Sequence, residues 1–293
     1  MNQKITFQWS SAGRSHVGMV RAINEDACLA MPELGLWTVA DGMGGHEAGD
    51  VASRMIVEAL QQIDPPRDWE DFLDSARNRL REVNRRLREE SAQRYQHRTI
   101  GSTVVVLLAY ETQCACLWVG DSRIYRLRDG QLQQLTRDHS HVQELVDQGL
   151  IAPEDAHRHP LANVITRAVG SAEELQIDEV IHPLQAGDLY LLCSDGLNKT
   201  VSDEEIAGLL AHSDHNCQEA VKAFIHLALM RDASDNVTTV VVNIGDPGRD
   251  PVEDAGSETL ANPIPPDWYL PVSYTHLRAH ETDSYLVCRL LLE

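Results

Sequence analysis

Apolar residues divide the first 245 positions into short strand-like runs and longer segments with helical spacing. Apolar runs too short for helices predict strands at 5–10, 27–31, 36–40, 102–109, 113–119, 124–127, 132–135, 164–169, 177–182, 188–193 and 237–244. Apolar positions three or four residues apart predict helices at 48–60, 72–87, 203–212 and 216–230. Most strand connections are short, so the sheets should be mainly antiparallel. We therefore expect an α+β fold with packed sheets and helices on the outside.

A polar, histidine-rich segment interrupts this pattern at residues 139–163. Pro153 and Pro160 are incompatible with one continuous helix there. We predict a short helix and an irregular flap.

The composition changes after Gly245. Residues 246–271 are rich in Pro, Asp and Glu, which predicts a disordered linker. Residues 272–293 have no clean period and resemble a translated tail fused to unrelated proteins. We interpret this segment as non-native, from a sequencing or read-through error, with a genuine interaction tail as the alternative. The folded domain is therefore expected over residues 1–245.

The chain carries a net charge of −20, and residues 1–245 alone carry 36 acids against 22 bases, or −14. Nucleic acid is thus excluded as an expected partner, because phosphate backbones are bound by clustered Lys and Arg. The simplest consequence of the acidity is solubility. Bound metal ions would neutralise part of it.

The six cysteines lie mainly in apolar runs and are expected to be reduced core residues. None stands six positions before an Arg, as the loop of a cysteine-based phosphatase requires. The N-terminus lacks the basic and apolar regions of a signal peptide. No apolar run reaches the roughly 18 residues of a membrane span. We expect a cytoplasmic protein without membrane contact.

Acidic motifs stand at the edges of several apolar runs. They are Asn24-Glu25-Asp26, Asp41-Gly42, Asp121-Ser122, Asp195-Gly196 and Asp235-Asn236. Each alone is typical of a turn. Strands that each deliver one carboxylate to a common end would form an oxygen-lined site for hard divalent cations.

Taken in order, these motifs resemble those of bacterial PPM-type (type 2C) serine/threonine protein phosphatases. The matching segments are 17–26, 40–46, 101–103, 119–123, 136–140, 163–170, 194–197 and 235–238. The resemblance covers about residues 12–245. It implies an α-β-β-α sandwich of two mainly antiparallel sheets flanked by helices, and an enzyme that removes phosphate from Ser and Thr of proteins.

The resemblance also implies a centre of two Mn²⁺ or Mg²⁺ ions. Asp41 would bridge the ions, Asp195 and Asp235 would complete the shell of one, and the Gly42 carbonyl would bind the other. A glycine at position 42 would allow the backbone to turn this oxygen inward.

Three further acids have implied roles in this centre. Asp26, with Glu25, would hold metal-bound waters, and Asp121 would share a third, weaker ion with Asp195. The two main ions would lower the pKa of a bridging water, which attacks phosphorus without a phosphoenzyme. Arg21 is the expected phosphate clamp, since its planar fork matches phosphate oxygens. Arg21, Asp41 and Asp195 are thus the predicted catalytic residues.

The proton donor for the leaving alkoxide is left open by the sequence. Met43 stands directly after Asp41-Gly42, where eukaryotic members often carry a histidine. A metal-bound water is one alternative. Histidines are the others, although a structural role is expected for each: His46, His139, His157 and His159.

Two other functions compete with protein dephosphorylation. A phosphoprotein-binding module without turnover would be expected to lose one of Asp41, Asp195 or Asp235, and all three are present. A hydrolase of small phosphoesters stays open, because a metal centre recognises phosphate rather than the group attached to it. The expected partners are phosphorylated proteins and, by resemblance, a cognate serine/threonine kinase. Ser102 and Ser194 are expected to be hydrogen-bonding residues at strand ends rather than nucleophiles.

Overall fold

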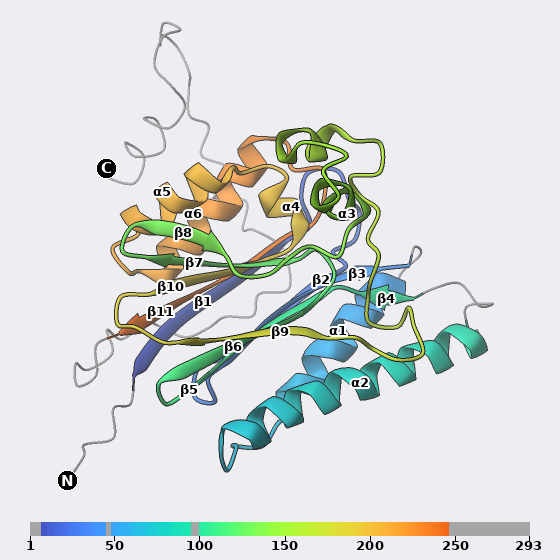
Figure 1. The fold of residues 1–293 in the computed structure, drawn as a ribbon, viewed down its shortest axis with the longest axis horizontal. Helices are drawn as coiled ribbons and strands as arrows, with labels where there is room; N and C mark the ends of the chain where they lie inside the picture. The colour runs from blue at the N-terminus through green and yellow to red at the C-terminus, as the bar shows by residue number, and fades with distance from the viewer. Residues whose placement is uncertain (1–6, 45–47, 95–99, 246–293) are drawn as a thin grey trace, which may run out of the picture. The chain divides into compact units, whose positions relative to one another are not determined.

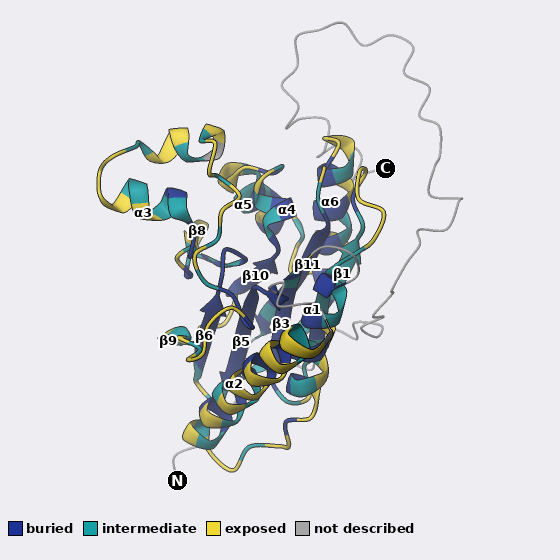
Figure 2. Ribbon diagram, turned by 90° about the vertical axis from the view of Figure 1, so that its right-hand side faces the viewer, coloured by how far each residue is buried: buried dark blue, intermediate teal, exposed yellow. Residues whose placement is uncertain are grey.

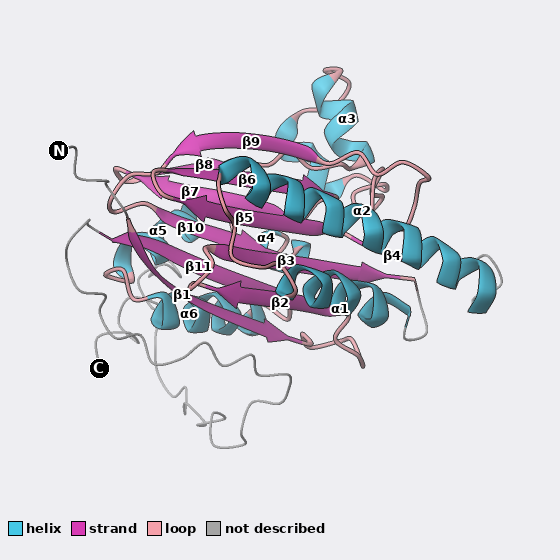
Figure 3. Ribbon diagram, turned by 90° about the horizontal axis from the view of Figure 1, so that it is seen from below, coloured by secondary structure: helices cyan, strands magenta, loops and turns pink. Residues whose placement is uncertain are grey.

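Two antiparallel sheets packed face to face form the centre of the computed structural model, which describes residues 7–44, 48–94 and 100–245 (Figure 1). Helices cover the outer face of each sheet, as the view from below also shows (Figure 3). The α+β sandwich predicted from the sequence is confirmed. His46 and the predicted segments 246–271 and 272–293 lie outside the described residues.

The first sheet has the strand order β1-β11-β10-β7-β8. Its strands are β1 (Gln8–His16), β7 (Arg123–Arg128), β8 (Gln131–Gln134), β10 (Leu189–Cys193) and β11 (Val237–Gly245). The last strand of the domain, β11, lies between β1 and β10 and pairs with both in antiparallel fashion. Segments from the two ends of the domain are therefore neighbours in one sheet, with β1 at its edge.

The second sheet has the order β2-β3-β5-β6-β9, and the short strand β4 pairs with β3. Its strands are β2 (Asp26–Met31), β3 (Leu36–Met43), β4 (Gly101–Ser102), β5 (Val104–Tyr110), β6 (Gln113–Val119) and β9 (Asp178–Pro183). The β5–β6 hairpin turns at residues 111–112, between the strands predicted at 102–109 and 113–119. The β7–β8 hairpin turns at Asp129 and Gly130, whose φ angles of 51° and 74° are typical of a two-residue turn.

Two pairs of helices cover the sheets. The helices α1 (Ala48–Gln61) and α2 (Trp69–Arg94) pack on the second sheet, and α5 (Asp203–His212) and α6 (Cys217–Met230) pack on the first. The predicted bounds of α1, α5 and α6 are right within one residue, whereas α2 begins three residues earlier and ends seven residues later than predicted. Within the described ranges, no helix combines the length and apolar composition needed to cross a bilayer.

The buried residues form layers that follow the period of two along each strand. On β5, Val104 and Val106 belong to the layer under α1 and α2, whereas Val105 and Leu107 face the other sheet. Figure 2 shows this burial along the strands and the exposed outer face of α2. Each fully buried aliphatic side chain contributes about 1.5–3 kcal/mol. The core thus fixes the register that places the strand ends together.

Two predicted strands differ from the observed ones. Strand β1 runs to His16, although the pattern predicted a strand only at 5–10. Because β1 is an edge strand, its second half needs no continuous apolar run. Residues 164–169 form no strand, so that prediction was wrong: the segment makes only isolated bridges, from Ile165 to Ser140 and from Val169 to Ser102. Through these bridges the segment connects the flap to the start of α3 (His141–Asp147) and to β4.

The segment predicted as a flap contains two short helical elements, α3 (His141–Asp147) and the 3₁₀-helix η1 (Pro153–Arg158). Ser140 caps α3 by accepting a hydrogen bond from the Gln143 backbone amide at 3.3 Å. The sequence did not predict the helix α4 (Asp195–Asn198), because four residues are too few to show a helical period.

Candidate metal centre

Asp26 and Asp41 face each other across the β2–β3 ladder. Asp26 begins β2 and Asp41 stands near the end of β3, so antiparallel pairing brings them to the same edge. The backbone amide of Gly42 also donates to the Glu25 carbonyl oxygen at 3.1 Å. The first two acidic motifs of the sequence therefore meet.

Antiparallel pairing also brings Asp195 and Asp235 to the same edge of the first sheet. Asp195 follows β10 and begins α4, whereas Asp235 stands just before β11. Because β10 and β11 are antiparallel neighbours, the end of one lies beside the start of the other. Each sheet thus contributes two carboxylates to one end of the sandwich.

Asp26 connects the two sheets at this end. Its Oδ2 accepts hydrogen bonds from Ser194 Oγ and Thr238 Oγ1, both at 2.7 Å. Its Oδ1 is buried without a hydrogen-bond partner among the described residues. Burial raises the pKa of Asp26 to about 7, helped by Asp195 and Asp235 and opposed by the two hydroxyl donors. A buried, half-satisfied carboxylate of this kind favours a nearby cation or water.

The backbone of Asp41 is held by residues 102 and 103. Its carbonyl oxygen accepts from the Thr103 amide at 2.8 Å and from Ser102 Oγ at 2.9 Å. Its amide donates to Thr103 Oγ1 at 3.3 Å. These contacts, with the Ser194 bond to Asp26, confirm the predicted hydrogen-bonding role of Ser102 and Ser194.

Close packing gives a further reason for glycine at position 42. Its φ lies outside the left-handed region. A Cβ there would stand 2.0 Å from the Gly49 carbonyl oxygen and 2.6 Å from that of Glu25. Glycine at this position therefore allows β3 to approach β2 and the first turn of α1 closely.

Five carboxylates act on one another at this end of the sandwich. The pKa of Asp41 is raised well above its ordinary value, first by burial and then by Asp26, Asp195, Asp121 and Asp235. Asp121 follows β6 and is 7% exposed, and burial with Asp195 and Asp138 raises its pKa to about 7. Such crowding of negative charge is unfavourable without compensating cations. Carboxylate oxygens in this number suit hard divalent ions.

Two basic side chains engage these acids in the structure. Lys199 Nζ contacts Asp195 Oδ2, and Arg21 pairs with Asp235. With the side chains so placed, no three His, Cys, Asp or Glu side chains in the described part of the chain are arranged as ligands of one ion. The donor set nevertheless fits a metal, since Asp26 Oδ1 and Asp195 Oδ1 are buried and unpartnered. The metal roles of Asp41, Gly42, Asp195 and Asp235 stay predictions.

Arg21 and Glu25 have well-defined contacts. Arg21 Nη2 and Nε lie 3.0 Å from Asp235 Oδ2 and Oδ1, and its side chain is 50% exposed. The Glu25 carboxylate accepts from the Gly49 backbone amide at the start of α1, a favourable place for negative charge. Burial is the main cause that raises the pKa of Glu25.

Asn236 is a structural residue of the site that the sequence did not single out. Its Oδ1 accepts from the Glu25 amide at 2.8 Å. Its Nδ2 donates to the carbonyl oxygens of Val17 at 2.9 Å and Ile23 at 3.1 Å. One amide side chain thus fixes the loop that carries Arg21. The only signal in the sequence was its place directly after Asp235.

His139 supports the flap rather than the acidic site. Its Nδ1 accepts from the Gly120 amide at 3.1 Å, its Nε2 lies 3.2 Å from Asp178 Oδ2, and its ring stacks on Trp118. Burial lowers its pKa. His159 Nδ1 accepts from the Leu161 amide at 3.2 Å, within a local turn. These contacts support the structural roles expected of the two histidines, and the identity of the proton donor stays open.

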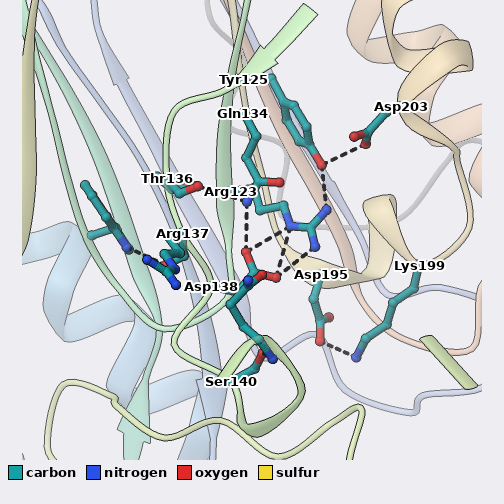
Figure 4. A network of polar contacts seen from close by, with 12 residues as sticks. Arg123, Tyr125, Gln134, Thr136, Arg137, Asp138, Ser140, Asp195, Lys199 and Asp203 are labelled. Carbon is teal, nitrogen blue, oxygen red and sulfur yellow. Dashed lines mark hydrogen bonds and ion pairs between the residues drawn. The ribbon is translucent and has the colours of Figure 1, made fainter. Parts of the chain in front are cut away.

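A buried polar network stands beside the site (Figure 4). The Arg123 guanidinium holds both oxygens of Asp138 at 2.8–3.1 Å and donates to the Tyr125 hydroxyl at 2.8 Å. The Tyr125 hydroxyl in turn donates to Asp203 Oδ1, at the start of α5, at 3.1 Å. This network joins the root of the flap to the first sheet, and the Asp195–Lys199 pair lies next to it (Figure 4).

Comparison with known proteins identifies the family. The family model for protein phosphatase 2C matches residues 12–229. The chain therefore belongs to the protein phosphatase 2C family, which confirms the resemblance seen in its motifs.

Curated relatives are bacterial. The serine/threonine protein phosphatase PstP of Mycobacterium tuberculosis is 39% identical over 243 residues, which are 83% of this chain and 46% of PstP. The chain thus matches about half the length of that relative. The serine/threonine phosphatase stp of Listeria welshimeri is 37% identical over 218 residues, or 72% of this chain and 86% of stp.

Solved structures agree with the fold. PppA of Pseudomonas aeruginosa, described as a key regulatory component of T6SS, is 48% identical with a TM-score of 0.75, covering 82% of this chain and 99% of PppA. The catalytic domain of PstP in complex with 2 manganese ions is 38% identical with a TM-score of 0.75, covering 82% of this chain and 100% of that domain.

Proposed function

We propose that this chain is a metal-dependent protein phosphatase that hydrolyses phosphoserine and phosphothreonine on proteins. The observation that carries the proposal is the clustering of four carboxylates at one end of the sandwich. Those of Asp26, Asp195 and Asp235 lie close enough to Asp41 to raise its pKa. The manganese ions of the PstP catalytic domain support the choice of two Mn²⁺ or Mg²⁺ ions as cofactors.

Asp41, Gly42, Asp195 and Asp235 would hold the two ions. Bound Mn²⁺ or Mg²⁺ supplies a Lewis acid that shields the phosphoryl charge and makes water a better nucleophile. Ser194 and Thr238 both donate to Asp26 Oδ2 and so fix the orientation of the carboxylate. Its Oδ1 has no hydrogen-bond partner among the described residues. We infer that this oxygen orients water at the centre.

Arg21 would bind the phosphoryl group. Its guanidinium already binds a planar anion, the Asp235 carboxylate, through two nitrogens. Half of the side chain remains exposed, so it can contact a substrate from outside. The hydroxyls of Ser102 and Ser194 are engaged in hydrogen bonds, which supports direct attack by water rather than a phosphoenzyme.

Phosphorylated proteins are the proposed substrates, and a serine/threonine kinase is the proposed counterpart. The names of the PstP and stp relatives support the first part. We also propose a cytoplasmic location. Cys28, Cys114, Cys116 and Cys193 form no disulfide among the described residues, and the last three are buried, which supports a reducing compartment.

Phosphate release from a phosphothreonine peptide, with Mn²⁺ and then with excess EDTA, tests the proposal. We expect release that depends on Mn²⁺ and that Asp195→Asn or Asp41→Asn reduces at least about 1,000-fold. Asp129→Asn, at the exposed β7–β8 turn, is the matched control and should retain activity. Wild-type activity in Asp195→Asn would contradict the proposal. A panel that includes small phosphoesters separates a protein phosphatase from a general hydrolase.

A further inference from the structure

Lys199 stands one helical turn after Asp195. The four-residue helix α4 and its C-cap place the two side chains at positions i and i+4, which face each other. Lys199 Nζ contacts Asp195 Oδ2, with 31% of the lysine side chain and 13% of the aspartate side chain exposed. The aspartate end of this ion pair is therefore largely shielded from solvent, whereas nearly a third of the lysine side chain is exposed.

The two oxygens of Asp195 have different surroundings. Oδ2 is occupied by the Lys199 ammonium, and Oδ1 is buried without a hydrogen-bond partner in the described part of the chain. One carboxylate can therefore offer Oδ1 to a metal ion and keep Oδ2 on the ammonium. The pairing with Lys199 and the proposed role of Asp195 as a ligand are compatible.

Lys199 also faces Asp121. The charge of Lys199 acts on Asp195, Asp121 and Asp235, in that order. Two further basic groups among the described residues have carboxylate partners of their own, since Arg123 holds Asp138 and Arg21 holds Asp235. Figure 4 shows the Asp195–Lys199 pair beside the Arg123–Asp138 pair. Lys199 is thus a cation that acts on both carboxylates of the Asp121–Asp195 edge.

We propose that the Lys199 ammonium takes the place of a third divalent ion at the Asp121–Asp195 edge, so that this chain holds two ions. The inference rests on the metal centre of the proposed function. A fixed positive charge on Asp195 repels a further divalent ion that approaches the same carboxylates, and it supplies part of the neutralisation that the ion would bring. The Lys199 ammonium already contacts Asp195 in the folded chain, so this role needs no rearrangement of the fold.

Counting bound Mn²⁺ tests this proposal independently of catalysis. Titration calorimetry and electron paramagnetic resonance would compare the full chain with Lys199→Asp and Lys199→Gln. Lys222→Asp is the matched control, because Lys222 pairs with Glu219 on α6 at similar exposure, 38% against 31%. We expect two Mn²⁺ in the wild type and the control. Both Lys199 variants should bind a further ion at least about tenfold more tightly than the wild type does.

Adding Asp121→Asn to Lys199→Gln should remove the further ion, whereas Asp121→Asn alone should leave the wild-type count unchanged. A wild type that binds three ions, or Lys199 variants that still bind two, would overturn the proposal and leave the phosphatase function intact. A wild type that binds no Mn²⁺ would overturn both. Circular dichroism establishes that each variant is folded, and Lys199→Gln retains the test if Lys199→Asp does not fold.

Discussion

The Arg21 guanidinium binds the Asp235 carboxylate through two nitrogens: Nη2 lies 3.0 Å from Oδ2, and Nε lies 3.0 Å from Oδ1. The contact joins the loop before β2 to the turn before β11, more than 200 residues apart in the sequence. The hydrogen bond to Asp235 is the main cause that raises the pKa of Arg21, so the guanidinium stays charged throughout the physiological range. A permanent cation beside a predicted metal ligand is suited to binding a phosphoryl group.

Arg21→Ala should lower kcat/KM on a phosphothreonine peptide by about 10–100-fold, the effect of losing charged hydrogen bonds. Arg21→Lys should recover only part of this loss, because an ammonium lacks the planar fork. Steady-state kinetics at saturating Mn²⁺ measures both. Arg85→Ala, on the exposed face of α2, is the control and should leave kcat/KM unchanged. Equal activity of Arg21→Ala and the wild type would remove Arg21 from the proposed mechanism.

Thr238 and Thr239 are adjacent and fully buried, and their hydroxyl groups differ in hydrogen bonding. Thr238 Oγ1 donates to Asp26, whereas Thr239 Oγ1 has no hydrogen-bond partner among the described residues. Thr238→Val should therefore destabilise the fold by about 1–3 kcal/mol and weaken Mn²⁺ binding. Thr239→Val should be neutral or stabilising by up to about 1 kcal/mol. Urea unfolding measures both, and a larger loss in Thr239→Val than in Thr238→Val would contradict the assignment.

Removal of metal should make stability depend on the charge of Asp121. Its pKa is about 7 in the folded chain and 3.8 ordinarily, so the unfolded chain releases this proton first as pH rises. The stability that Asp121 contributes is therefore complete below pH 3.8 and is lost as pH rises towards 7.

In EDTA, Asp121→Asn should gain on the order of 1–4 kcal/mol over the wild type between pH 4 and pH 8. Unfolding by urea at both pH values measures the difference. Because the comparison is between two chains, the titration of groups remote from Asp121 cancels. A constant difference between the two chains across this range would show that the carboxylate is not desolvated.

Truncation after Gly245 should leave phosphatase activity within about twofold of the full chain. Strand β11 ends at Gly245, and its pairings with β1 and β10 are complete within the domain. Side-by-side kinetics of the full and truncated chains measures this. A large loss would assign a function to residues 246–293.

Much of the fold was predictable because its elements carry strong local patterns. The helices α1, α2, α5 and α6 each show an apolar face, and the turn at Asp129-Gly130 has the chemistry that a tight hairpin requires. The segment 164–169 was assigned wrongly as a strand. Its apolar residues serve contacts with the flap root and β4, and a short apolar run does not distinguish these contacts from a sheet.

The acidic residues of the site could be predicted from the sequence, whereas the residues that contact and position them could not. Asp41 and Asp195 stand at the ends of apolar runs, where antiparallel strands bring carboxylates together. The roles of Asn236 and Lys199 depend on contacts that only the folded chain defines. Asn236 contacts backbone groups more than 200 residues away, and Lys199 depends on a helix too short to predict. The need for Gly42 likewise comes from the approach of α1.

The position of β11 between β1 and β10 has a consequence for synthesis of the protein. A chain leaving the ribosome makes β1 first and β11 last among the described strands, and β1 has no neighbour until β11 has emerged. Asp235 and Thr238 arrive with that strand. The nascent chain therefore holds an unpaired β1 and an incomplete set of carboxylates until residues 235–245 have been made, so the domain should fold late.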